Sequence, residues 1–387
     1  MKKEIIISAI LLLVMTGCGG NRQFGNENDT FITVDIRASY PQKELILQDF
    51  MDVEYIALET SDEFLCQGIV LDIGKDIILV KNNIFDGDIF IFTRNGKGLR
   101  KINRKGQSGE EYINIQGITL DEDVGEMFVN DNFAKKIMMY DLYGRFQRRM
   151  QNDGEFVYNN ICNFDSINLI GDDMPIRIGP DGGGFGNSPF VVISKQDGRI
   201  VHNIQIPFER KKSPLVIQRD GNNTRISFHP HISIIPYRDT WILTATSSDT
   251  VFRFYSDFSM IPFIVRTPSI QSMDPEVFLF PKMLTDRYYF METLKNENEF
   301  PKTDLMYDRQ ERAIYEYSLY NDDYSSKQRV KTSWGAKNDG SIYWQKIEAY
   351  ELVESYKKGE LKGRLKEIAA GLDEEDNAVI MLVKYKK

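Results

Sequence analysis

The sequence predicts an all-β protein: a six-bladed β-propeller with a helical insertion in the last blade. The first observation is a β-hairpin pattern that recurs along the chain. The second is length, because 387 residues exceed the ~250–300 at which one ordinary hydrophobic core stops growing. The third is that no Pro/Ser-rich linker divides the chain after residue 31. Together they favour growth by repetition over a division into separate domains.

The clearest copy of the hairpin lies at residues 88–102. Residues 89–92 are apolar and predict a strand, and residues 99–102 predict its return. Between them, Asn95 and Gly96 form a strong turn signal because both tolerate positive φ. This copy is the reference for the weaker ones that follow.

Four more copies of the strand, turn and return strand follow along the chain. The ends of the equivalent strands are separated by 48, 53, 62 and 52 residues, near the ~40–50-residue period of propeller blades. A four-stranded sheet of this size cannot bury both of its faces alone, so neighbouring blades are expected to stack around a central axis. The strand ends are Phe92, Tyr140, Ile193, Tyr255 and Tyr307.

The sixth copy is interrupted. Residues 341–344 and 378–385 read as strands, and about 345–372 reads as an amphipathic helical stretch, with apolar residues three or four apart. Two interpretations stay open for it: a helical hairpin packed on the propeller, or a partner-docking element. To close the ring, we expect residues 31–36 to pair with 378–385 and residues 53–58 to lead into the first full blade.

The N-terminus has the layout of an export signal. Lys2 and Lys3 precede an apolar run at residues 5–15, which is too short to span a membrane. Residues 15–18, Met-Thr-Gly-Cys, resemble the bacterial lipobox, in which the Cys becomes the lipid-modified N-terminus. We therefore expect a lipoprotein signal peptide at 1–17, lipid attachment at Cys18, a flexible tether at 18–30 and the propeller at 31–387. An ordinary signal peptide with an incidental Cys is the alternative.

This reading places the protein in the cell envelope. Cys18 carrying a diacylglycerol and an N-acyl chain gives stable membrane attachment, since two or more chains are needed for it. No acidic cluster follows Cys18, and in some bacteria such a cluster directs lipoproteins to the cell surface. We expect anchoring to the outer membrane on its periplasmic face, with surface exposure left open.

The net charge argues against nucleic acid as a partner, and the cysteine content leaves open whether the mature chain has a disulfide. The formal net charge is −9, and it becomes −10 when Lys2, Lys3 and Glu4 leave with the signal peptide. Nucleic-acid binding is therefore not expected, because it needs clustered Lys and Arg. Cys66 and Cys162 remain in the mature chain. They are able to pair in an oxidising compartment, but they lie in different predicted repeats, which favours two buried thiols.

Three segments resemble a bacterial family of lipoproteins with a six-bladed, NHL-like β-propeller and a domain of unknown function. Residues 55–60 (YIALET) are similar to its Y-I-P-L-E-T entry. Residues 95–97 and 104–112 resemble its N-G-K and R-K-G-x-G-P-G-E-Y segments, and residues 365–377 match near the end. Ala57 stands where the family has Pro, and residues 108–110 replace Gly-Pro-Gly. The resemblance implies the propeller fold from about residue 31 onward. It implies no catalytic residues.

The loop at 104–112 is the first candidate ligand-binding segment. It is basic and contains glycine, and it would present Arg104, Lys105, Glu110 and Tyr112 at the propeller mouth. The alternative is a structural connection from the outer strand of one blade to the inner strand of the next.

His229 and His231 are the second candidates. At positions i and i+2 they would face one side of a strand, and on an inner strand they would line the central channel. Closed or catalytic zinc sites need three or four ligands with defined spacing, and the remaining histidine, His202, is distant in sequence. No metal, cofactor or catalytic residue is therefore predicted.

The sequence predicts a lipid-anchored envelope protein that uses the propeller mouth to bind a ligand. Propellers gather loops from every blade around one end, and loops on rigid scaffolds carry function. A glycan, a peptide or an envelope protein is the expected partner, beside the membrane itself. The alternative is a propeller hydrolase or lyase acting on polysaccharide, for which no pair of carboxylates stands out by spacing.

Overall fold

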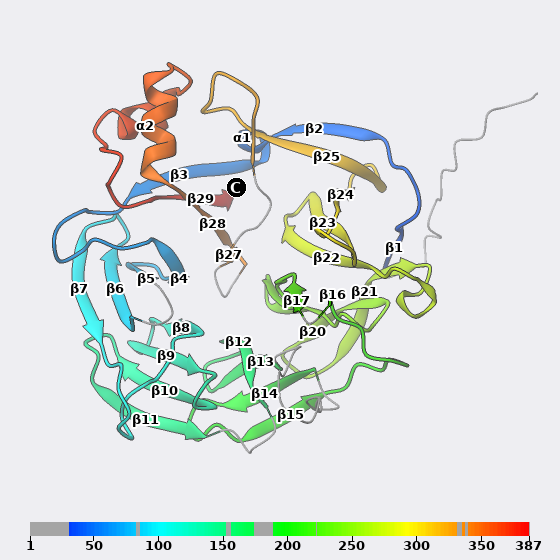
Figure 1. The fold of residues 1–387 in the computed structure, drawn as a ribbon, viewed down its shortest axis with the longest axis horizontal. Helices are drawn as coiled ribbons and strands as arrows, with labels where there is room; N and C mark the ends of the chain where they lie inside the picture. Colours follow the sequence, from blue (N-terminus) through cyan, green and yellow to red (C-terminus); the bar gives the residue numbers. More distant parts are fainter. Residues whose placement is uncertain are drawn as a thin grey trace, which may run out of the picture.

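The computed structural model describes residues 31–82, 86–151, 156–173, 189–221, 223–330, 335–336 and 340–386. It confirms the six-bladed β-propeller: six antiparallel sheets surround a central axis (Figure 1). The predicted signal peptide, Cys18 and the tether lie outside the described residues. Among the helices of the described part, none is long and apolar enough to cross a membrane.

In the first three blades, the strands follow one another from the axis outward. Middle strands are buried on both faces because adjacent blades cover both sides, and every residue of the second strand of blade 1 is buried. Blade 1 contains β4 (Ile69–Ile73), β5 (Ile77–Lys81), β6 (Asp88–Thr93) and β7 (Gly98–Asn103); blade 2 contains β8 (Gly117–Asp121), β9 (Glu126–Asp131), β10 (Lys136–Asp141) and β11 (Phe146–Gln151); blade 3 contains β12 (Tyr158–Asn163), β13 (Asn168–Asp173), β14 (Phe190–Ser194) and β15 (Ile200–Ile204).

A separate two-stranded hairpin, β16 (Leu215–Asp220) with β17 (Asn223–Phe228), interrupts the passage from blade 3 to blade 4. It explains why the interval between the third and fourth predicted strand ends is the longest. Blades 4 and 5 then continue the ring, with the turn η1 (Ile270–Ser272) between them. Blade 4 contains β18 (Ile234–Tyr237), β19 (Thr240–Thr244), β20 (Thr250–Tyr255) and β21 (Met260–Thr267); blade 5 contains β22 (Val277–Leu284), β23 (Tyr288–Lys295), β24 (Lys302–Asp308) and β25 (Ala313–Asn321), with the short β26 (Gln328–Arg329) beside β25.

Blade 6 closes the ring by joining the two ends of the fold. Its strands are β27 (Gly335–Ala336), β28 (Ile342–Ile347), β29 (Val379–Tyr385) and, outermost, β3 (Met51–Ala57), which pairs antiparallel with β29. The prediction that residues 31–36 make this pairing is wrong. They contain β1 (Ile32–Asp35), which instead runs parallel to β21 at the edge of blade 4. Residues 53–58 are not an approach to the first blade but part of the closing strand.

The N-terminal segment covers the outer edges of two blades before it closes the third. After β1, strand β2 (Gln42–Ile46) runs parallel to β25 and adds a further strand to blade 5. The short helix α1 (Leu47–Phe50) then leads directly into β3. These additions protect sheet edges that would otherwise offer unpaired backbone groups.

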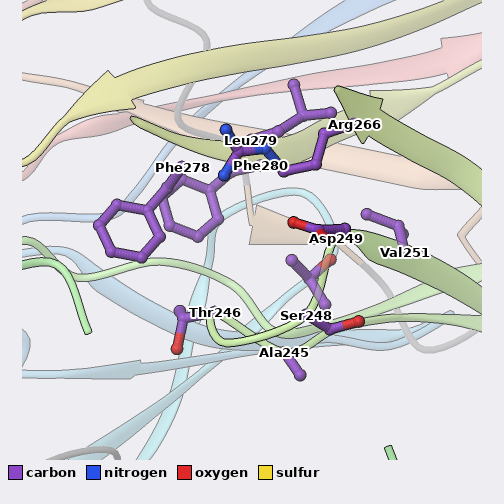
Figure 2. A pocket seen from close by; sticks show the side chains of 10 residues that line it. Ala245, Thr246, Ser248, Asp249, Val251, Arg266, Phe278, Leu279 and Phe280 are labelled. Carbon is purple, nitrogen blue, oxygen red and sulfur yellow. The ribbon is translucent and has the colours of Figure 1, made fainter. Parts of the chain in front are cut away.

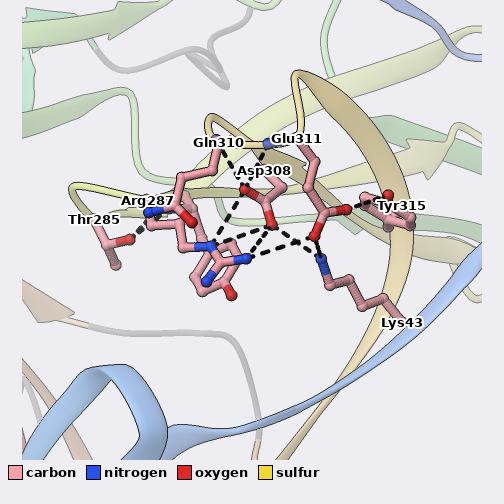
Figure 3. A network of polar contacts seen from close by, with 8 residues as sticks. Lys43, Thr285, Arg287, Asp308, Gln310, Glu311 and Tyr315 are labelled. Atoms are coloured by element: carbon pink, nitrogen blue, oxygen red, sulfur yellow. Dashed lines mark hydrogen bonds and ion pairs between the residues drawn. The ribbon is translucent and has the colours of Figure 1, made fainter.

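A polar cluster holds β2 onto blade 5 (Figure 3). Asp308 is fully buried and accepts hydrogen bonds from Lys43 of β2 at 2.9 Å and from Arg287 at 3.0 Å. Burial by itself would raise the pKa of the Asp308 carboxyl, but the bonds from Arg287 and Lys43 outweigh it and lower the pKa. The cluster is a structural clamp on the rim of the ring.

The rim turns between the third and fourth strands pack against the preceding blade. Gly96 has φ +88°, and a Cβ built there would lie 2.0 Å from the carbonyl oxygen of Ala57. The carbonyl of Gly96 also accepts a 2.8 Å hydrogen bond from the backbone N–H of Glu59. The next turn repeats the contact, since Arg104 Nε donates to the carbonyl of Gly144 at 2.8 Å.

Where the structure describes them, the connections from one blade to the next and those between the second and third strands of a blade share one end of the ring. We call this end the long-loop face. It carries the 104–116 loop, the 205–233 segment with its hairpin, and the insertion in blade 6. That insertion contains helices α2 (Ala349–Lys357) and α3 (Gly363–Ala369), as the sequence predicts. Their apolar sides pack onto the core of blades 5 and 6 through Leu352 and Leu365, which confirms the packed interpretation.

The two cysteines do not pair. Cys66 packs in the core between blades 6 and 1, and Cys162 packs in the core between blades 3 and 4. Burial raises the pKa of the Cys66 thiol to about 11 and that of Cys162 to about 12.

Candidate functional site

Two adjoining cavities open among the loops of the long-loop face. The larger, of about 60 Å³, lies between blades 3 and 4, and the smaller, of about 10 Å³, lies between blades 4 and 5. Residues 244–246, at the end of β19, line both cavities and separate them. Figure 2 shows the smaller cavity, with Arg266 and Phe280 on one side and the loop of Thr246 and Ser248 on the other.

Asp172 forms the floor of the larger cavity. It is the second-last residue of β13, and only 5% of its surface is exposed. Its carboxylate accepts hydrogen bonds from the backbone N–H of Asn160 at 2.7 Å and from the hydroxyl of Ser233 at 2.6 Å, and a longer one from Asn159 Nδ2 at 3.3 Å. Burial raises the pKa of Asp172 to about 6 although these bonds favour the charged form.

His231 forms part of the wall of the same cavity. Its ring stacks on Phe280 of β22, with the centroids 4.7 Å apart. Burial lowers the pKa of His231 to about 4, so the ring is neutral at physiological pH. Its Nδ1 has no hydrogen-bond partner among the described residues. The ring therefore supplies an apolar surface with one unused polar atom.

His229 also faces blade 5. It contacts Phe300 edge-on, with 5.7 Å between the ring centroids. Burial and the nearby Lys302 lower its pKa. The His-Pro-His segment follows β17 and is not a strand, so strand alternation does not set the directions of the two rings. Both rings nevertheless contact aromatic residues of one cluster in blade 5, His231 on Phe280 and His229 on Phe300.

A buried ion pair lies beside His229. Glu292 of β23 is almost fully buried, and its carboxylate lies 2.7 Å from Lys282 Nζ and 3.5 Å from Lys302 Nζ. Two cations thus surround one carboxylate, which leaves this part of the site with excess positive charge.

Arg266 dominates the smaller cavity. It lies near the end of β21, and only 4% of its surface is exposed. Nη2 donates to the sulfur of Met273 at 2.9 Å, whereas Nε and Nη1 have no partner among the described residues. Burial lowers the pKa of Arg266 to about 10, against the opposing effect of Asp249.

The hairpin β16–β17 lies near the centre of the ring (Figure 1). Gln218 on one of its faces donates a 2.6 Å hydrogen bond to Asn298 of the blade 5 loop. On the other face, Ile217 lies directly opposite Ile226, and each is 51% exposed. The hairpin thus turns an apolar face away from blade 5.

The predicted loop residues lie elsewhere, between blades 1 and 2. Arg104, Lys105 and Glu110 are exposed, whereas Tyr112 is fully buried. The Tyr112 hydroxyl donates to the carbonyl of Gly87 at 2.7 Å and accepts from the backbone N–H of Arg104 at 2.9 Å. The loop connects β7 to β8, as the structural alternative holds. Of the predicted residues, His231 lines a cavity and His229 lies beside the ion pair.

Sequence reasoning missed two groups of the site whose pKa values are strongly shifted. Arg266 and Asp172 carry no signal, since a charged residue near a strand end is usually solvated. The hairpin did leave a signal, because Asp220-Gly221 between residues of strand type is typical of a tight turn. This turn signal predicts an additional hairpin between the third and fourth blades.

The described side chains give the two cavities apolar walls with a few polar groups. Across the described ranges, no group of three or more His, Cys, Asp or Glu side chains could hold a metal ion. The oxygens of Asp172 are already engaged by blade 3 and by Ser233, which reduces their use in proton transfer. Apolar walls with a few polar groups are typical of a binding pocket.

The fold and the site define the class of protein: a six-bladed β-propeller with a loop-lined mouth. The chain matches the family described as a domain of unknown function, DUF4934, over residues 31–384. The chain therefore belongs to this family, which agrees with the resemblance seen in the sequence.

Solved structures that are similar to the chain have low sequence identity to it. A protein described as exported, from Bacteroides fragilis NCTC 9343, has a TM-score of 0.61 and 15% identity, and the match covers 89% of this chain and 100% of that one. A member of the DUF4221 family from Bacteroides vulgatus has a TM-score of 0.45 and 9% identity, with 87% and 96% covered. None of the curated proteins matches the chain.

Proposed function

We propose that the protein is a lipid-anchored envelope propeller that binds a ligand at its long-loop face. The proposed anchor is Cys18, and the proposed location is the outer membrane, on its periplasmic face. The ligand is a glycan, a peptide or a segment of an envelope protein. The observation that carries the proposal is the concentration of exposed apolar side chains in the connection between blades 3 and 4, in which Phe208 and His231 line the larger cavity.

These side chains come from a single connection. Among the described residues, the large exposed apolar side chains are scattered over the whole surface, but five of them fall within residues 208–232. Isolated exposed apolar residues are normal, whereas a gathered patch marks an interaction site. The patch consists of Phe208, Ile217, Ile226, Phe228 and Ile232.

The size of the cavities limits what enters them. A water-sized group needs about 10–15 Å³ of such space, so a cavity of about 60 Å³ takes a small group of a few heavy atoms, such as a hydroxymethyl or a carboxyl. The body of the ligand would lie over the apolar patch. Such an arrangement supports recognition of a chain-like ligand by one inserted group.

A thermal-shift screen of residues 19–387, which keep every described residue, tests the binding. The panel holds neutral and acidic oligosaccharides and short peptides, with product analysis in every well. A ligand that binds only the native state raises the melting temperature by mass action. Ile217→Thr with Ile226→Thr should reduce the shift, while Tyr143→Thr, exposed on the rim turn of blade 2, should not.

The raised pKa of Asp172 is the one observation that favours the enzymatic alternative, a hydrolase or lyase acting on polysaccharide, because a general acid needs such a pKa. A raised melting temperature together with cleaved ligand would establish the enzymatic alternative and overturn the binding proposal for that ligand. A shift with intact ligand supports the binding module.

The anchor is tested separately. Full-length protein should partition with membranes and incorporate a radiolabelled fatty acid, and Cys18→Ala should abolish both. Labelling that persists in Cys18→Ala would contradict the proposed attachment site.

A further inference from the structure

The guanidinium of Arg266 is nearly buried and only partly satisfied. Its five N–H donors are distributed over three nitrogens, and two of these, Nε and Nη1, find no acceptor in the described structure. The third, Nη2, contacts a thioether sulfur, which is a weak acceptor. A buried charge without hydrogen-bonded compensation is costly.

Its acidic neighbour does not complete the site. Asp249 lines the same cavity, but its carboxylate accepts a 2.6 Å hydrogen bond from the backbone N–H of Ile270. No ion pair between Asp249 and Arg266 is found in the described residues, although the two interact at longer range. Asp249 thus offsets part of the positive charge of Arg266 but accepts no hydrogen bond from Nε or Nη1.

The cavity is built around this guanidinium. Figure 2 shows the Arg266 side chain reaching towards Phe280 and Phe278, opposite the loop that carries Thr246 and Ser248. A space of about 10 Å³ is close to the smallest that accepts a single water-sized group. One oxygen atom therefore fits, and an oxygen carrying negative charge fits best.

We propose that Arg266 binds an oxyanion group of the ligand, a carboxylate, phosphate or sulfate, with one of its oxygens inserted between blades 4 and 5. Arginine is suited to this task because its planar donors match the geometry of such groups. This inference rests on the proposed binding function and adds the chemical class of its ligand: an acidic glycan, an acidic peptide or a phosphorylated compound.

The surrounding charge agrees with an acidic ligand. Residues 208–229 contain five Lys or Arg and two Asp or Glu, a net charge of +3 in a chain of net charge −9. Of these cations, Arg219 and Arg225 are exposed on the hairpin. A local positive region on an acidic protein guides anions to one place.

The test compares wild type with Arg266→Met in residues 19–387. The probes are inorganic phosphate, digalacturonate and the dipeptide Glu-Glu, all at one ionic strength set with NaCl. At least one probe should raise the melting temperature of the wild type, and Arg266→Met should lose that shift.

Without any probe, Arg266→Met should itself melt higher, by about 2–4 °C, because an uncompensated buried charge is replaced by an apolar side chain. Arg199→Met, on the exposed rim turn of blade 3, is the control and should behave as wild type with every probe.

The probe that raises the melting temperature identifies the source of the oxyanion. A shift with phosphate alone assigns a phosphorylated ligand, and a shift with digalacturonate or Glu-Glu assigns a carboxylate from a glycan or a peptide. Equal shifts in wild type and Arg266→Met would overturn the inference, and so would no shift with any of the three.

A lower melting temperature of Arg266→Met without probes would also overturn it, because that result makes Arg266 a structural residue. If neutral oligosaccharides shift both proteins equally, the binding function stands and only the assignment of the oxyanion site fails.

Discussion

The hydroxyl of Ser233 donates a 2.6 Å hydrogen bond to the carboxylate of Asp172, and this bond joins blade 3 to blade 4. Ser233 precedes the innermost strand of blade 4, and Asp172 lies near the end of the second strand of blade 3. The bond therefore fixes the distance between the two blades at the point where the larger cavity opens.

Asp172→Asn should change how stability depends on pH. Burial raises the pKa of Asp172 from 3.8 to about 6 in the folded protein, so the folded state binds more protons between these values. The stabilisation that this extra proton binding gives the folded state is complete below pH 4 and is lost as pH rises through 6. The free energy of unfolding of Asp172→Asn relative to wild type should therefore increase from pH 4 to pH 7, by up to about 3 kcal/mol. Urea titrations at several pH values measure it, with the exposed Asp239→Asn as control; a constant difference would contradict the prediction.

Lys43→Met should loosen the N-terminal segment from blade 5. It leaves the buried Asp308 carboxylate with fewer donors, at an expected cost of about 1–3 kcal/mol in the free energy of unfolding. Because the pKa of Asp308 is lowered, the stabilisation is present above its unfolded pKa and is lost as pH falls through the folded value. The loss caused by Lys43→Met should therefore shrink in acid. Lys75→Met, which removes the exposed ion pair with Asp123, should cost much less, because exposed ion pairs contribute little to stability; an equal cost for both would be inconsistent with the clamp.

Gly96→Ala and Gly125→Ala separate backbone strain from close packing. Both glycines have positive φ, +88° and +72°, which costs about 1–2 kcal/mol for another residue. A Cβ at Gly125 meets nothing within 4 Å, whereas one at Gly96 would clash with the carbonyl of Ala57. Gly96→Ala should therefore be more destabilising by about 1–3 kcal/mol. Similar denaturation midpoints for the two variants would show that the rim contact does not restrict Gly96.

The thiols of Cys66 and Cys162 should react slowly in the folded protein. Burial raises both thiol pKa values well above neutrality, and the thiolate is the reactive species. At pH 7.5, Ellman's reagent should titrate two thiols in residues 19–387 after unfolding in guanidinium and far less than one before it. Fewer than two thiols in the unfolded, unreduced protein would reveal a disulfide that contradicts the structure.

The sequence was sufficient to predict the ring of blades and the length of the repeat, because the blade hairpins carry local signals such as Asn95-Gly96. It did not identify the closing strand. Residues 31–36 and 51–57 both alternate as edge strands do, and the choice between them depends on packing against blades 4 and 6, which no local pattern encodes.

The candidate site was predicted only in part. Histidines are rare in this chain, so His229 and His231 drew attention and do lie beside the cavities. Arg266 could not be found from the sequence, because its importance comes from what surrounds it after folding. The same holds for Asp172, whose raised pKa is a result of burial between two blades.

The closure of blade 6 has a consequence for the order of events in biogenesis. Asn377 donates a hydrogen bond to the carbonyl of Glu59, 318 residues earlier in the chain, and β29 lies beyond it. Contacts between such distant parts form slowly, and these cannot form until β29 has been synthesised. A chain that is threaded across a membrane from its N-terminus would therefore remain an open arc throughout translocation and become a ring only when its last strand arrives.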